Sequence, residues 1–266
     1  MGPLLITLLR YAIAGLFLQG LGIIKGDIGP RIAQATERDK IYLFLLGTFG
    51  VVGYHYFFFS SLRHTVVANS AIINAFNPVV TGFLAAAILK EKLAARNYVG
   101  GAIAIIGVLI LLTNGNLVSL LQLQFNRGDL LMLCAVVCWA IYSILLRHLG
   151  KRYSGLAMSY YGGLFGALQL SFLVIPELRQ TGFPELSTAA MLGLLYMGIG
   201  ASGIGYLLFT MSTQRIGPTK STSIVYSGVP IWVALLAWLF FQEPVTPWML
   251  VSMCFILVGL KTILKR

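Results

Sequence analysis

Two stretches of this chain share one pattern. They read AFNPVVTGFLAAAILKEKL, at residues 75–93, and SGVPIWVALLAWLFFQEPV, at residues 227–245. Each places a proline thirteen residues before a glutamate, Pro78 before Glu91 and Pro230 before Glu243. The two stretches lie 152 residues apart. The repetition predicts that two parts of the chain are built on one plan.

The composition is that of a protein surrounded by lipid. Hydrophobic residues make up 58% of the chain, charged residues only 10%, and the mean hydropathy is +0.86. Because so few polar side chains cannot coat a soluble globule, we expect an all-α integral membrane protein. The three cysteines, Cys134, Cys138 and Cys254, lie in apolar runs. Their odd number and positions predict neither a disulfide framework nor a paired-cysteine metal site.

Membrane spans were sought with a window of about 20 apolar residues, the length needed to cross the hydrocarbon. The first one is read as a span and not as a signal peptide, because it contains Arg10 and has no basic leader. The window predicts nine helices, at residues 3–24, 41–62, 65–88, 95–113, 128–147, 155–175, 187–209, 216–241 and 245–263.

The basic residues alternate between the loops and predict the orientation. Fifteen Lys and Arg residues fall in the segments 25–40, 89–96, 147–154, 210–220 and 261–266, against three in the loops on the other side. By the positive-inside rule, the basic set and the C-terminus are cytoplasmic. The net charge of +11 therefore reflects topology, and we expect no nucleic acid partner.

The repeat extends beyond the opening pattern. At the same offset of 152, Gly53 and Tyr54 match Gly205 and Tyr206, and Gly107 matches Gly259. The predicted topology puts Glu91 and Glu243 on opposite sides, so we expect an inverted five-plus-five repeat, with residues 1–113 and 128–266 as its copies. The helix 128–147 has no partner at this offset. We therefore expect nine helices of a ten-helix plan, because the start is truncated or because a nine-helix form exists.

Several motifs together resemble a known family. GPLLITLLRYAIAGLFL, at residues 2–18, is similar to the second helix of EamA-type members of the drug/metabolite transporter superfamily. The two proline–glutamate hairpins, followed by IIGVLILL at 105–112 and LVGLKTIL at 257–264, resemble the paired EamA signatures. The resemblance implies a ten-helix exporter or exchanger of small metabolites. Amino acids or related metabolites are the first expectation for the substrate, and amphiphilic drugs the second.

The candidate substrate-binding residues begin with a polar stripe. Ser70, Asn74, Asn77 and Thr81 follow at spacings of four, three and four, which places them on one face of the helix 65–88. At the repeat offset, Ser70 and Asn74 match Thr222 and Tyr226, and Ser227 follows directly. Polar side chains in a membrane helix face a watery cavity or another helix. We expect them to line a cavity, and interhelical hydrogen bonds remain the alternative.

Prolines and aromatic residues complete the predicted site. Pro78 and Pro230 lack an amide hydrogen, so each would free a carbonyl four residues earlier and act as a gate hinge or as a plain kink. Tyr54, Tyr206 and Trp139 would form the wall of the pocket, although aromatic residues also serve as ordinary packing in membranes.

Four charged or titratable residues have competing interpretations. Arg10 lies about two turns inside the first helix and would serve a gate, contact a substrate anion or snorkel outward. His55 could titrate near neutral pH, but a hydrogen-bonded core histidine is the more common case. Glu91 and Glu243 are structural motif residues that precede new helices, where a carboxylate is favoured.

The sequence predicts transport and not catalysis. It has no cluster of metal ligands, phosphate loop or paired intramembrane acids, so we expect no enzyme activity, no metal and no cofactor. Arg63 and His64, at a membrane surface, leave a lipid-head-group enzyme as an alternative. A non-transporting sensor or partner subunit is the second hypothesis. We expect an inner-membrane transporter that works by alternating access, with a small-molecule substrate and the lipid bilayer as partners; a homodimer stays open.

Overall fold

The structure is a computed structural model of the 266-residue chain. It describes residues 2–26, 35–65, 70, 73–90, 94–113, 115–116, 118, 126–182, 187–241 and 246–264. All regular elements among these residues are helices, which confirms the all-helical prediction. Two compact units are formed, Met1–Phe59 with Ile141–Gly217 (unit 1) and Ser60–Ala140 with Pro218–Arg266 (unit 2). Each unit takes segments from both predicted repeats, so the compact units are not the repeats themselves.

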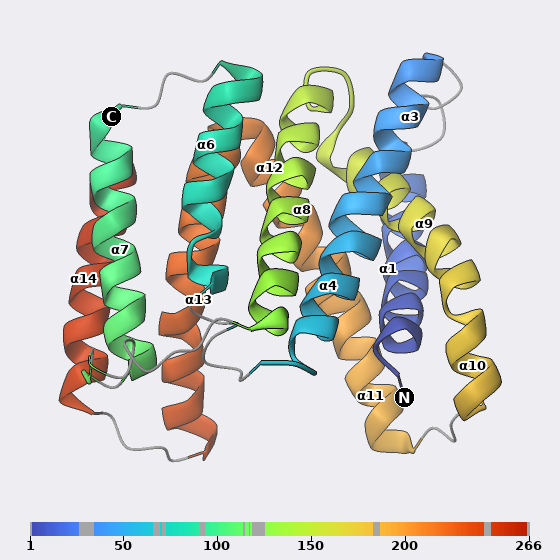
Figure 1. The fold of residues 1–266 in the computed structure, drawn as a ribbon. Helices are drawn as coiled ribbons and strands as arrows, with labels where there is room; N and C mark the ends of the chain where they lie inside the picture. The colour runs from blue at the N-terminus through green and yellow to red at the C-terminus, as the bar shows by residue number, and fades with distance from the viewer. Residues whose placement is uncertain are drawn as a thin grey trace. The chain divides into compact units, whose positions relative to one another are not determined.

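Unit 1 combines two separate parts of the chain (Figure 1). Its first part consists of α1 (Pro3–Lys25), α3 (Glu37–Leu46), a π-helical segment η1 (Gly47–Gly53) and most of α4 (Tyr54–Ser61). Its second part consists of α9 (Gly155–Leu173), α10 (Ile175–Thr181), α11 (Thr188–Leu195), a second π-helical segment η3 (Tyr196–Gly205) and α12 (Tyr206–Ile216). Helix α8 (Arg127–Leu149) begins in unit 2 and ends in unit 1.

Polar side chains mark where the helices of unit 1 begin. Thr36 and Asp39 form a capping box at the start of α3, because each side chain bonds the backbone N–H of the other residue. Ser154 caps α9 and Ser187 caps α11. At the start of α1, the Glu177 carboxylate accepts from the first backbone amides, where a negative charge is favoured.

The two π-helical segments have the same plan. Each is rich in glycine, and each ends directly before a tyrosine, Tyr54 or Tyr206. A side chain at Gly47 would begin 2.5 Å from the Gly166 backbone nitrogen, and one at Gly198 would begin 2.7 Å from Ile13 Cβ. The glycines therefore let α9 approach η1 and α1 approach η3 closely.

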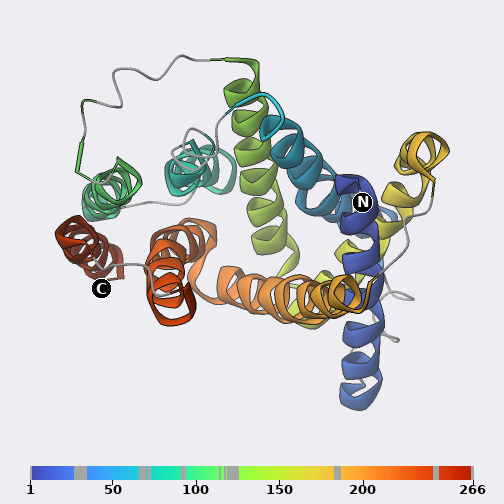
Figure 2. The same cartoon turned by 90° about the horizontal axis from the view of Figure 1, so that it is seen from below.

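Unit 2 is built from two helical hairpins, α6 (Asn77–Leu89) with α7 (Ala95–Thr113) and α13 (Pro218–Phe241) with α14 (Pro247–Leu264). Helices α7 and α14 lie side by side (Figure 2). A side chain at Gly259 would begin 2.6 Å from the Gly100 carbonyl oxygen, so small residues hold this pair together. Helix α6 ends and α7 begins at one end of unit 2, whereas α13 ends and α14 begins at the opposite end (Figure 1).

Several predicted spans needed correction. The helix expected over 65–88 is interrupted at Phe76, whose amide bonds the Ile73 carbonyl, and α6 begins at Asn77 with a proline in its first turn. The cause is Pro78, because its nitrogen has no hydrogen to donate to the Asn74 carbonyl four residues earlier and its ring crowds that carbonyl. The span expected over 155–175 ends at Leu173, and a separate α10 follows. The span expected over 41–62 begins earlier, at Glu37, and the span expected over 187–209 continues to Ile216.

The described part of the chain contains several helices suited to a bilayer. Four of them are long and apolar enough to cross a membrane: Pro3–Lys25, Glu37–Ser61, Arg127–Leu149 and Thr188–Ile216. Three apolar helices are shorter: Ile73–Leu89, Ala95–Leu111 and Pro247–Ile263. Together with the composition, these helices make the chain a multi-pass membrane protein.

Candidate functional site

The polar stripe of the predicted site lies in unit 2. Asn77 and Thr81 are fully buried, and Ser70 is buried. The Asn77 side-chain amide donates to Asn74 Oδ1 at 3.5 Å, and the Thr81 hydroxyl donates to Asn77 Oδ1 at 3.3 Å. Ser70 is paired with Ser61 at 3.3 Å. Asn74, Asn77 and Thr81 therefore form a connected network, Ser70 bonds separately to Ser61, and Asn74 is the member of the stripe that is partly exposed.

Two predicted aromatic residues meet in the same unit. The rings of Trp139, on α8, and Tyr226, on α13, are 6.3 Å apart in an edge-to-face arrangement. Such pairs are a favoured geometry between aromatic rings. Ser227, the next residue, is buried. This pair supplies an aromatic surface of the kind that substrate pockets use.

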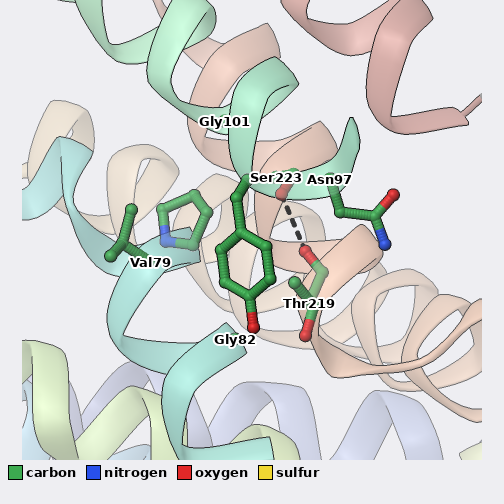
Figure 3. A pocket seen from close by; sticks show the side chains of 8 residues that line it. Val79, Gly82, Asn97, Gly101, Thr219 and Ser223 are labelled. Carbon is green, nitrogen blue, oxygen red and sulfur yellow. Dashed lines mark hydrogen bonds between the residues drawn. The ribbon is translucent and has the colours of Figure 1, made fainter. Parts of the chain in front are cut away.

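A small cavity lies beside the helix break, between α6, α7 and α13 (Figure 3). Its volume of about 30 Å³ is sufficient for a single water molecule. Thr219 lines it with a buried hydroxyl that has no hydrogen-bond partner among the described residues. Ser223, one turn later, donates to the Thr219 carbonyl at 2.8 Å. Sequence reasoning missed both residues, although their spacing of four places them on one helix face.

The other predicted aromatic residues lie in unit 1. Tyr54 and Tyr206 each pack against His55, with ring centroids at 5.2 and 6.4 Å. Tyr11 packs edge-on against both His55 and Tyr206, at 5.6 and 5.5 Å. His55 Nδ1 lies 2.8 Å from the Val51 carbonyl oxygen in η1. The expectation that His55 is a hydrogen-bonded core residue is therefore supported by its contacts.

Arg10 also has a defined partner in unit 1. Its Nε and Nη2 atoms donate to the hydroxyl of Ser202, in η3, at 3.1 and 2.9 Å. Ser202 is buried, whereas Arg10 is partly exposed. The side chain is thus held on a neighbouring helix, in contrast to a snorkelling arginine.

The hinge and motif residues are only partly described. Pro78 is buried in the first turn of α6, directly after the break at Phe76. Pro230 lies at the matching repeat position, but the backbone of α13 continues through it. Glu91 and Glu243 lie outside the residues that the structure describes.

A polar cluster lies on the predicted cytoplasmic side of unit 1. Arg152 donates to Asp39 at 3.1 Å, and the Tyr153 hydroxyl donates to the same carboxylate at 3.3 Å. Burial, together with the Asp39 charge, raises the pKa of the Tyr153 phenol, which therefore remains a donor. The Gln214 side chain donates to the Tyr153 carbonyl at 2.7 Å, so α3, α12 and the turn before α9 are joined.

Residues 1–113 and 126–264 match the model of the EamA-like transporter family. The chain belongs to this family. An EamA-like chain is a membrane transporter, in agreement with the resemblance found in the sequence.

Curated relatives of this EamA-like transporter include two with named substrates. The probable terminal-alkyne amino-acid exporter of Streptantibioticus cattleyicolor is 26% identical, over 96% of this chain and 85% of its own. The aromatic amino acid exporter YddG of Ancylobacter novellus is 21% identical, over 88% of this chain and 78% of its own. The uncharacterized transporter YyaM of Bacillus subtilis is 27% identical, over 88% of this chain and 76% of its own. A crystal structure with 19% identity aligns with a TM-score of 0.79 over 98% of this chain and 87% of its own, which shows the shared fold.

Proposed function

We propose that this EamA-like transporter exports or exchanges small metabolites, amino acids first, across the inner membrane by alternating access. The observation that carries this proposal is the duplication of the π-helical segments. Both η1 and η3 end one residue before a repeat-matched tyrosine, Tyr54 or Tyr206. Such segments inside α-helices are rare and are found mostly at functional sites.

The arrangement of unit 2 supports an inverted repeat. The helix that contains Pro78, α6, and the one that contains Pro230, α13, end at opposite ends of the unit (Figure 1). A transporter built from two oppositely oriented copies can open a similar gate on either side of one site. The two named amino-acid exporters among the relatives support amino acids as the substrate class.

The substrate-binding residues of this proposal are the predicted ones. In unit 2 they are Ser70, Asn74, Asn77, Trp139, Tyr226 and Ser227, and in unit 1 they are Tyr54 and Tyr206. Asn74 is the member of the polar stripe with exposed surface, and Trp139 and Tyr226 provide the aromatic contact. Pro78 and Pro230 would serve as hinges, with the break at Phe76 as the structural support for the first of them.

Flux through the purified full-length chain tests this function. Liposomes that contain the protein and are preloaded with unlabelled amino acid should take up the labelled amino acid with saturable kinetics. Their uptake should be faster than that of protein-containing liposomes loaded with buffer alone. Protein-free liposomes measure the leak. Uptake that never saturates, for amino acids and for other small metabolites alike, would contradict transport. Flux that appears only in native membranes would instead support a partner subunit.

A further inference from the structure

The most unusual charge of the molecule is that of Arg10. It lies seven residues after the start of α1, about 10 Å along the axis at a rise of ~1.5 Å per residue. Its guanidinium bonds Ser202, which lies fourteen residues from either end of the helix Thr188–Ile216. The positive charge is therefore held toward the middle of a span, where charged side chains are rare and usually functional.

No carboxylate neutralises Arg10 within the part of the chain that the structure describes. A cation held within a membrane span normally pairs with an anion, yet the hydrogen-bond partner found for Arg10 among the described residues is a neutral hydroxyl. The acidic residues that the structure describes have other contacts: Glu37 with Lys40, Asp39 with Arg152, Asp129 with Thr65, and Glu177 with the first amides of α1.

The other half of the repeat shows that the fold does not require this pair. Helix α1 packs on η3, and α9 packs on η1 in the corresponding way. At the offset of 152 residues, Arg10 matches Gly162, and Ser202 matches Gly50. Glycines therefore occupy both matching positions of the second interface, where Gly47 and Gly166 allow the close approach. Its side-chain hydrogen bond, from Thr48 to Gln169 at 2.9 Å, is uncharged. The charge on one side only points to a task that packing does not explain.

Two further hydroxyls can donate near the guanidinium. Ser202 Oγ accepts both bonds from Arg10, so its own hydroxyl hydrogen is left to donate. Tyr11 is the next residue of α1; its buried hydroxyl interacts electrostatically with Arg10, and it makes no hydrogen bond of ordinary geometry among the described residues. The neighbouring Tyr206 hydroxyl donates to the Gly50 carbonyl instead. A single positive charge with hydroxyl donors fits a planar, singly charged acceptor.

We propose that Arg10, with Ser202 and Tyr11, binds the carboxylate of the transported molecule, so that the substrates of this protein are small carboxylates or zwitterions. The inference rests on the proposed transport function and names its substrate class. Arg10 is partly exposed, so its side chain is not sealed inside the protein. A guanidinium preorganised by Ser202 would select for the charge of the ligand and not for its side chain.

A binding assay tests this assignment independently of flux. The full-length protein in detergent is heated with L-phenylalanine, L-leucine or L-threonine, and in parallel with the carboxamide of each. We expect at least one carboxylate to raise the melting temperature and its carboxamide to bind about tenfold or more weakly, because the charge-assisted bonds are lost. Arg10→Gln should remove this preference, and Arg10→Lys should restore part of it.

The controls separate this inference from the proposed function. Arg179→Gln removes an exposed arginine of the same unit and should leave the preference unchanged. Equal preference in wild type and Arg10→Gln, or stabilisation by none of the three carboxylates, overturns the assignment. Selective binding without flux in liposomes would keep the site and reject transport. If Arg10→Gln does not accumulate, Ser202→Ala and Tyr11→Phe take its place: a weaker preference supports the site, and an unchanged one overturns it.

Discussion

The hydroxyl of Tyr206 donates to the carbonyl of Gly50 at 3.1 Å. This bond joins the two π-helical segments of unit 1, because Gly50 lies within η1 and Tyr206 directly follows η3. It also joins residues from the two halves of the predicted repeat. The two segments therefore cannot separate without breaking a bond in the interior of the unit, where water is scarce.

Removing that bond should destabilise the protein measurably. Tyr206→Phe leaves the Gly50 carbonyl without its side-chain donor, at a cost of about 1 kcal/mol. We expect a lower melting temperature in detergent with unchanged insertion. Tyr196→Phe, which removes a hydroxyl from a tyrosine that is 77% exposed, is the matched control. An equal effect of the two substitutions would show that the bond does not contribute.

The contact between α7 and α14 should tolerate no side chain at Gly259. A Cβ there would begin 2.6 Å from the Gly100 carbonyl oxygen and 2.7 Å from the Ala104 nitrogen. Gly259→Leu should therefore push the helices apart, with a loss of about 1–3 kcal/mol and reduced membrane abundance. Gly20→Leu is the control, because Gly20 is an exposed helical glycine and a Cβ there meets nothing within 4 Å. Normal abundance and melting temperature for Gly259→Leu would refute this packing.

Substitutions at the partly exposed residues Asn74 and Tyr226 of unit 2 should affect flux more than folding. Asn74→Ala and Tyr226→Ala should each reduce flux about tenfold, the effect of roughly one hydrogen bond or contact of ~1.4 kcal/mol. Membrane abundance should stay at the level of wild type, because both side chains are only partly buried. Full flux in both variants would remove these residues from the proposed site.

The orientation can be tested with reporters at the C-terminus. The excess of Lys and Arg in the segments that include 261–266 predicts that this end is cytoplasmic. A C-terminal green fluorescent protein should fluoresce, and a C-terminal alkaline phosphatase should be inactive. The reverse pattern would invert the topology and move the Asp39–Arg152 cluster to the outer face.

Much of the fold follows from hydropathy and from the repeat, and the corrections have physical causes. Apolar runs locate the helices, but they do not distinguish π-helical from α-helical bonding, because both give continuous apolar sequences. The glycines before Tyr54 and Tyr206 were the only sign of η1 and η3. A hinge or kink was expected at Pro78, because a proline cannot donate the helical bond to the carbonyl four residues earlier.

The candidate site was less accessible from the sequence. The network of Asn74, Asn77 and Thr81 follows from helical spacing. The partner of Arg10 could not be found in this way, because Ser202 is 192 residues distant and belongs to a segment with little polar signal. Contacts of this kind depend on which helices pack together, and hydropathy does not specify that.

The interruption at Phe76 has a consequence for the energetics of the transport cycle. Helix α6 is jointed beside its proline, whereas α13 runs unbroken through the matching Pro230. Bending a helix that is already broken costs less than bending one with intact backbone bonds. The forms open to the two sides should therefore be unequally populated at rest. Without substrate or gradient, such a transporter should favour the form open to one side of the membrane over the form open to the other.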